Sequence, residues 1–138
     1  MPIALVLQNV VAGDPVKQWL PAEHYTILAD NMAVGAIRLR IGDADSVRYI
    51  GHVGYSVDSA HQGRGYATLA IREIANRARR HDFQELWITI RPDNIASQRA
   101  CLKAGARYVD TVAVPAGHDL YERGDREMQR YRLKVRSA

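Results

Sequence analysis

The sequence predicts a mixed α/β fold of the α+β kind, with helices packed on one sheet. Three observations support this prediction. The chain has 138 residues, 47% of them hydrophobic and 25% charged, which fits one soluble globular domain. Its apolar residues alternate in some segments and recur with a 3.6-residue period in others. The resulting order is strands, helix, strand, helix, strands, which is typical of helices covering a sheet.

The first part of the chain predicts strands joined by short connections. Residues 3–11 form an apolar run and predict the first strand. Residues 12–22 contain two prolines and leave room for little more than one helical turn. Residues 23–30 and 32–42 predict a strand pair that turns near Asn31.

The middle of the chain predicts a strand followed by the longest helix. After a turn at residues 43–46, residues 47–57 predict a strand, and Gly54 within it indicates a bulge or a close backbone approach. The helix is predicted over residues 65–81, because its apolar residues form one stripe. These residues are Ala67, Ala70, Ile71, Ile74, Ala75 and Ala78.

The last part predicts a second helix between strands. Residues 92–105 form the short helix, with Asn94 or Asp93 as its N-terminal cap. The other predicted elements are a strand at 85–90, a strand at 106–114, a loop at 115–127 and a last strand at 128–135.

Composition and charge exclude several classes of protein. The longest apolar run is five residues, far too short to cross a membrane, and a single cysteine rules out an internal disulfide. We therefore expect a cytoplasmic protein that needs no metal. The net charge of +4 indicates a phosphate-bearing partner. Nucleic acid is not favoured, because the chain has one phenylalanine and lacks a basic-aromatic stacking surface.

The stretch QGRGYA, residues 62–67, stands between the predicted strand and the long helix. A helix N-terminus offers unpaired N–H groups, and glycines let an anion approach the backbone. The alternative is a tight turn that needs glycine only for its geometry. The P-loop and the dinucleotide fingerprint both fit poorly, because Tyr66, Ala67 and Thr68 stand where those motifs need other residues.

Two motifs together resemble the GNAT superfamily of N-acetyltransferases. Gln62-x-x-Gly65-x-Ala67 is similar to its pyrophosphate-binding signature, and NIASQRACLKAGA, residues 94–106, looks like its second motif. The resemblance covers roughly residue 23 to the C-terminus. A more specific resemblance is to a compact bacterial branch of the superfamily. It implies a mostly antiparallel central sheet with splayed middle strands and flanking helices. It also implies one acyl-CoA N-acyltransferase domain over residues 1–138 with a shortened N-terminal acceptor region.

The resemblance further implies acetyl-CoA as cosubstrate, lying between the splayed strands. The residues expected to bind it are Tyr55, Ser56 and Val57 through main chain, Gln62, Gly63, Arg64, Gly65, Tyr66 and Ala67 around the pyrophosphate, and Asn94 and Ser97 from the short helix. The alternative for the helix face is a cap with small residues that pack on the sheet.

The catalytic groups depart from the superfamily pattern. Many members carry a tyrosine acid where Cys101 stands, so Cys101 and Ser97 are the candidate proton donors. Many also carry a glutamate base near Gly51, and its absence leaves His52 as the nearest titratable group. A structural role for His52 is the alternative.

The function implied is direct transfer of an acetyl group to a primary amine of an undefined acceptor, a small molecule or a peptide. The short segment before residue 23 leaves the acceptor cleft either open or completed by a second subunit, as in a homodimer. The alternative function is a non-catalytic acyl-CoA-binding module on the same fold.

Overall fold

The computed structural model describes residues 3–17 and 19–135. The domain predicted over residues 1–138 also includes residues 1–2, 18 and 136–138, which lie outside the described residues. The strands are β1 (Ile3–Val11), β2 (Ala22–Ala29), β3 (Met32–Arg40), β4 (Val53–Val57), β5 (Glu85–Ile90), β6 (Arg107–Ala113) and β7 (Glu127–Lys134). The helices are α1 (Tyr66–Ala78), α2 (Ile95–Lys103) and the short α3 (Asp119–Glu122), with 3₁₀ turns at Ser59–His61 and Arg79–His81.

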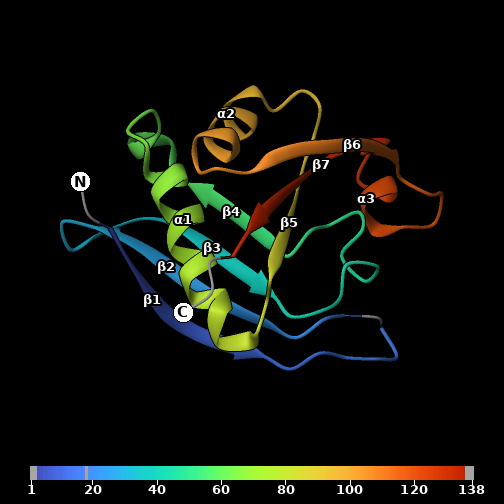
Figure 1. Ribbon diagram of the computed structural model, residues 1–138, viewed down its shortest axis with the longest axis horizontal. Helices are drawn as coiled ribbons and strands as arrows, with labels where there is room; N and C mark the ends of the chain where they lie inside the picture. The colour runs from blue at the N-terminus through green and yellow to red at the C-terminus, as the bar shows by residue number, and fades with distance from the viewer. Residues whose placement is uncertain (1–2, 18, 136–138) are drawn as a thin grey trace.

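The strands form two antiparallel sheets rather than the single sheet expected. One has the order β1-β2-β3-β4 and the other β5-β7-β6 (Figure 1). The neighbouring strands β4 and β5 form no ladder with each other among the described residues. They are held together at their beginning, where the His52 N–H donates to the Trp87 carbonyl at 2.7 Å. The mixed α+β fold with splayed middle strands is therefore confirmed.

Helix α1 crosses the four-stranded sheet and closes the core, with α2 beside its first turns (Figure 1). The stripe predicted on α1 is confirmed at Ala70, Ile71, Ile74 and Ala78, which are fully buried. They pack in one cluster with apolar residues of both sheets. The core thus fixes α1, and with it the turn that precedes α1, against the end of β4.

The predicted strand at residues 47–57 is wrong in its first half, because β4 begins only at Val53. The segment before it folds into turns, in which the Asp43 carboxylate accepts from the Ser46 N–H at 2.8 Å. The Gly51 N–H then donates to the Val47 carbonyl at 2.8 Å. Val47 looked like a strand residue because it is apolar, but it is buried within these turns.

The bulge predicted at Gly54 is absent from the pairing of β4 with β3. The register from Val53 to Val57 pairs with β3 without a shift. Gly54 instead lines a pocket, and a Cβ there would meet only the Arg38 and Arg40 side chains, at 3.4 to 3.5 Å, so no backbone approaches it closely.

The predicted loop at residues 115–127 contains α3, which the sequence did not predict. Leu120 of this helix packs with Val112, Val114 and Met128 in a second, smaller core. In the connection from β1 to β2, the described residues form a turn closed by a bridge between Asp14 and Trp19.

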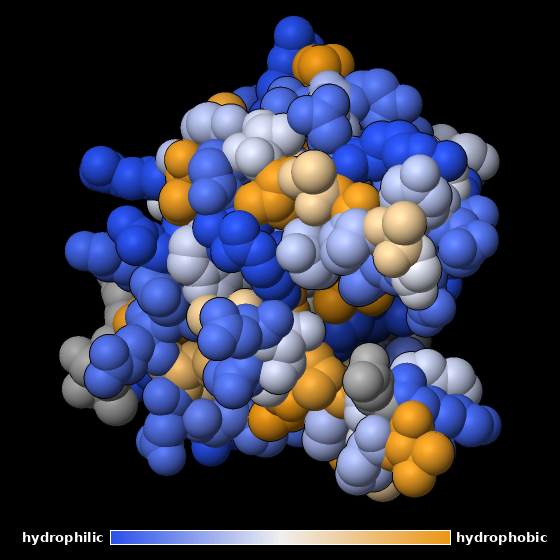
Figure 2. Space-filling view, turned by 90° about the vertical axis from the view of Figure 1, so that its right-hand side faces the viewer, coloured by the Kyte–Doolittle hydropathy of each residue, from blue (hydrophilic) through white to orange (hydrophobic). Residues whose placement is uncertain are grey.

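The surface beside α3 is mainly hydrophilic, with apolar side chains in separate patches (Figure 2). Within the described residues, every helix is too short or too polar to cross a membrane.

Candidate functional site

The turn before α1 is an open cradle of backbone groups. Gly63 and Gly65 have φ angles of 80° and 83°, a left-handed conformation that glycine adopts at low cost. A Cβ at either position would have no atom within 4 Å, so the space above the turn is free. Gly65 caps α1 without a side-chain hydrogen bond, which leaves N–H groups of the first turn available to a ligand.

Gln62 fastens this turn to the sheet. Its side-chain amide donates to the carbonyl of Val57, the last residue of β4, at 2.9 Å. The signature glutamine therefore has a visible local task, which is to hold the glycine turn against the strand end.

The cradle opens into a pocket of about 530 Å³ between β4 and α2. Every residue predicted to bind acetyl-CoA lines this pocket except Arg64, whose side chain is exposed. Arg99, Lys103 and His61 also line it, although the sequence analysis did not name them. The pocket thus combines the free backbone groups of the turn with added positive charge.

Three hydrogen bonds hold α2 against this pocket. The Asn94 side chain accepts from the Ser97 N–H at 3.2 Å, which confirms Asn94 as the cap of α2. The Thr68 hydroxyl donates to the Ala100 carbonyl at 3.3 Å and so ties α1 to α2. The Tyr55 hydroxyl donates to the Ser97 carbonyl at 3.4 Å and so ties β4 to α2.

A second pocket of about 320 Å³ continues the cleft toward the other face of the sheets. The two pockets share Tyr55, Asn94 and Ser97. On β3 the core side chains Ile37 and Leu39 alternate with Arg38 and Arg40, so the arginines belong to the face opposite α1. Because Arg40 lines the second pocket, the cleft passes between the splayed strands from the α1 side to the opposite side.

Tyr55 stands where the two pockets meet. The sequence predicts only a main-chain role for it, but its side chain reaches a residue 42 positions later in the chain. Burial raises the pKa of its hydroxyl, which is protonated at neutral pH and donates to the Ser97 carbonyl in this structure. No sequence motif signals this contact, because it depends on how β4 meets α2.

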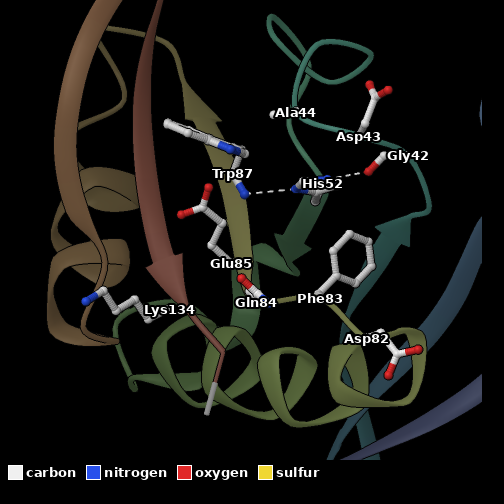
Figure 3. Close-up of a pocket in the computed structure, with 10 residues that line it drawn as sticks. All are labelled: Gly42, Asp43, Ala44, His52, Asp82, Phe83, Gln84, Glu85, Trp87 and Lys134. Carbon is white, nitrogen blue, oxygen red and sulfur yellow. Dashed lines mark hydrogen bonds between the residues drawn. The ribbon is translucent and has the colours of Figure 1, made fainter. Parts of the chain in front are cut away.

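His52 lies outside this cleft, in a third pocket of about 550 Å³ at the beginning of β4 and β5 (Figure 3). Both ring nitrogens are engaged: Nδ1 accepts from the Trp87 N–H at 2.9 Å, and Nε2 donates to the Gly42 carbonyl at 2.8 Å. Burial lowers its pKa, which favours this neutral form. The geometry thus supports the structural alternative for His52, because neither nitrogen faces the cleft.

Cys101 of α2 is fully buried in the core and lines neither pocket of the cleft. Burial raises the pKa of its thiol to about 12. A group that lies this deep and ionises this weakly is poorly placed to donate a proton to a leaving thiolate.

Gly51, where the superfamily glutamate was expected, has no room for a side chain. Its φ is 77°, and a Cβ would lie 3.0 Å from the Trp87 carbonyl oxygen and from the Thr89 nitrogen. The missing glutamate therefore follows from the close contact between β5 and this backbone.

Residues 12–107 match the family described as the acetyltransferase (GNAT) domain. The chain belongs to the GNAT family. This match covers more than half of the chain and includes the glycine turn, α1 and α2. A comparison with curated proteins found no match.

Solved GNAT structures share the fold at low sequence identity. RimL, a ribosomal L7/L12 α-N-protein acetyltransferase in complex with coenzyme A, is 20% identical, with a TM-score of 0.64 over 83% of this chain and 62% of its own. The microcin C7 self-immunity acetyltransferase MccE, in complex with acetyl-CoA and AMP, is 18% identical, with a TM-score of 0.61 over 83% of this chain and 61% of its own. Mycobacterium smegmatis RimJ, in complex with CoA-disulfide, is 19% identical, with a TM-score of 0.63 over 83% of this chain and 53% of its own. The chain thus spans about six tenths or less of these three proteins.

Proposed function

We propose that the chain is an acetyl-CoA-dependent N-acetyltransferase, a single domain that transfers acetyl directly to a primary amine. The observation that carries the proposal is the cleft, which runs from the open glycine turn past Tyr55 to a second pocket on the opposite face. Such a cleft lets two substrates enter from opposite sides and meet in its middle. Membership of the GNAT family supports this activity.

The glycine turn is the proposed site for the pyrophosphate of acetyl-CoA. Its backbone N–H groups and the first turn of α1 provide donors and the positive end of the helix dipole. Arg64, exposed beside the turn, adds charge at longer range. Gln62 holds the turn against the end of β4 through its hydrogen bond to the Val57 carbonyl.

The free edge of β4 is the proposed site for the pantetheine arm. The Arg40 N–H donates to the His52 carbonyl, and the Asp58 N–H donates to the Val34 carbonyl. By antiparallel alternation, Ser56 therefore directs its backbone groups to β3. Those of Val53, Tyr55 and Val57 point to the unpaired edge. We accordingly assign the pantetheine contacts to the backbone of Tyr55 and to the Val57 N–H, since the Val57 carbonyl already accepts from Gln62, while Ser56 lines the same pocket.

The middle of the cleft supplies the groups that acyl transfer requires. The main-chain N–H groups of Val53 and Tyr55 are the donors available to the thioester carbonyl oxygen as it gains charge. The hydroxyls of Tyr55 and Ser97 are the O–H groups best placed to donate a proton to the departing thiolate. Tyr55 thus takes the part that the sequence analysis gave to Cys101.

The acceptor amine must also lose its proton. For an ordinary alkyl amine at pH 7 this costs about 4 kcal/mol, because its pKa lies roughly 3 units higher. Asp125 is the only carboxylate among the described residues that line the second pocket. We assign it the removal of this proton, directly or through water, in place of His52.

The acceptor is a small amine or the N-terminus of a peptide. Among the named relatives, RimL acts on a ribosomal protein, and the MccE complex contains the small molecule AMP. A homodimer, a cytoplasmic location and independence from metals stay predictions, which light scattering, cell fractionation and a chelator test respectively.

A non-catalytic acyl-CoA-binding module is the second candidate. Two observations favour it: the buried Cys101 in place of the family tyrosine and the lack of room for a glutamate at Gly51. Release of free thiol from acetyl-CoA with a broad panel of amines separates the two candidates. Acetylated amine found by mass spectrometry supports the enzyme. Tight acetyl-CoA binding with no acetylated product across the panel supports the module.

A further inference from the structure

The second pocket carries an excess of positive charge. Among the residues that the structure describes, Arg40, Arg91 and Arg123 line it, and Asp125 is the one acidic residue of its lining. Arg91 lies 3.7 Å from the Asp93 carboxylate, and both side chains are largely exposed, so this pair belongs to the rim. Arg40 and Arg123 form no ion pair within the part of the chain that the structure describes.

Arg40 is the cation that most needs a counter-ion. It is half-buried, and its Nη1 donates to the carbonyls of Ile50 and Gly51 at 3.3 and 3.2 Å. Burial, together with the charges of Arg38 and Arg123, lowers its pKa to about 10. Arg40 is therefore still charged at neutral pH. A partly buried charge without an opposite partner is costly, so the pocket favours an anion that compensates it.

The phosphates of acetyl-CoA are not this anion. The proposed pyrophosphate site is the glycine turn in the first pocket, and the residues that join the two pockets are uncharged. The arm between them would present amides and a thioester at Tyr55. The anion must therefore come from the acceptor side.

We propose that the acceptor carries an anionic group, a carboxylate or a phosphate, close to its reactive amine, and that Arg40 and Arg123 bind this group. This inference rests on the proposed acetyl transfer. Asp125 attracts the ammonium end of the same molecule, so the pocket matches an acceptor with both charges. A volume of about 320 Å³ suits a small amino acid-like molecule or the first residues of an acidic peptide.

The test compares matched amines that differ only in the anion. The small pairs are 4-aminobutyrate with 4-aminobutanamide, and O-phosphoethanolamine with ethanolamine. The peptide pair is Ser-Asp-Asp-amide with Ser-Asn-Asn-amide. Affinity is measured by calorimetry on the CoA-saturated protein and again without CoA, and acetyl transfer is measured separately by thiol release.

We expect at least one anionic probe to bind about tenfold more tightly than its neutral partner, since a charge-assisted hydrogen bond contributes about that factor. The probe pair that shows the preference identifies the source of the anion. Arg40→Gln and Arg123→Gln should each remove most of the preference. Arg123 is exposed at the end of α3, so its variant tests the proposal even if Arg40→Gln folds poorly. Arg107→Gln, an exposed arginine of β6 outside all three pockets, is the matched control and should keep the preference.

Equal affinities within every pair, no binding of any anionic probe, or a preference that survives both Arg40→Gln and Arg123→Gln would overturn the inference. Loss of the preference in Arg107→Gln would overturn it too. Selective binding without acetyl transfer would leave the anion site standing and refute the proposed activity. Equal acetyl transfer to charged and neutral amines would support the proposed activity and refute the anion site.

Discussion

Replacing Gly65 by aspartate tests whether the turn before α1 binds the pyrophosphate. A Cβ at Gly65 would meet nothing within 4 Å, so the substitution causes no clash in the free protein. Its cost to folding comes from the φ of 83°, and it amounts to about 1 kcal/mol for a residue such as Asn or Asp that tolerates this conformation. Gly65→Asn has the same shape and backbone cost without the charge, and is the matched control.

The effect on ligand binding should be much larger than the effect on folding. Two like charges about 4 Å apart repel by about 1 to 4 kcal/mol, depending on how much water screens them, which corresponds to roughly a fivefold to thousandfold loss of affinity. Acetyl-CoA at a hundredfold excess over its dissociation constant should stabilise the wild type by about 2.7 kcal/mol. For a domain of this size the melting temperature should rise by roughly 10 °C.

The assay is thermal unfolding with and without acetyl-CoA at one fixed concentration. We expect the full shift in the wild type, a reduced shift in Gly65→Asn and a smaller one still in Gly65→Asp, with the two variants equally stable alone. By linkage, a tenfold loss of affinity leaves about 1.4 kcal/mol of the stabilisation, and a thousandfold loss leaves less than about 0.1 kcal/mol. An equal shift in Gly65→Asp and Gly65→Asn would show that no phosphate approaches this turn.

Three further predictions concern side chains in and beside the cleft. Tyr55→Phe should lower kcat by about 10- to 100-fold while acetyl-CoA affinity stays within a few-fold, because it removes a proton donor and leaves the main chain intact; lost affinity at unchanged kcat would contradict this. Cys101→Ala should lower kcat by less than Tyr55→Phe does, and the native thiol should resist alkylation, since it is fully buried and its pKa is raised to about 12; rapid alkylation or a trapped acetyl-cysteine would contradict this. His52→Leu should destabilise the fold at pH 8 by about 1–3 kcal/mol, because it leaves the Trp87 N–H and the Gly42 carbonyl unpaired. The folded-state pKa of His52 is depressed below 6.5, so its contribution to the free energy of unfolding is complete above pH 6.5 and is lost as the pH falls through the folded-state pKa. Denaturant titrations between pH 8 and pH 5 should therefore show a steeper loss of stability in the wild type than in His52→Leu. Parallel stability curves for the two proteins would contradict this role of His52.

The parts of the site that depend on local interactions were predictable from the sequence. The glycine turn, the start of α1 and the Asn94 cap all form between residues a few positions apart, so their signals stand within one short stretch. The apolar stripe of α1 likewise follows from its period. These features were enough to predict the fold class and the entrance of the cleft.

The parts that depend on distant contacts were not predictable. Tyr55 meets α2, and His52 meets Gly42 and Trp87, only because the two sheets join at the beginning of β4 and β5. The turns at residues 43–51 escaped prediction because Val47 is apolar enough to resemble a strand residue. Helix α3 is too short to show a period. Arg40 and Arg123 come from a strand and a loop whose proximity no pattern indicates.

A crystal structure of the protein with acetyl-CoA tests the cleft assignment most directly. We predict the pyrophosphate on the backbone N–H groups of Gly63 and Gly65, the arm along the free edge of β4, and the thioester beside Tyr55 and Ser97, facing the pocket of Arg40. Acetyl-CoA bound elsewhere, such as in the pocket beside His52, or a thioester directed away from Tyr55, would contradict the account.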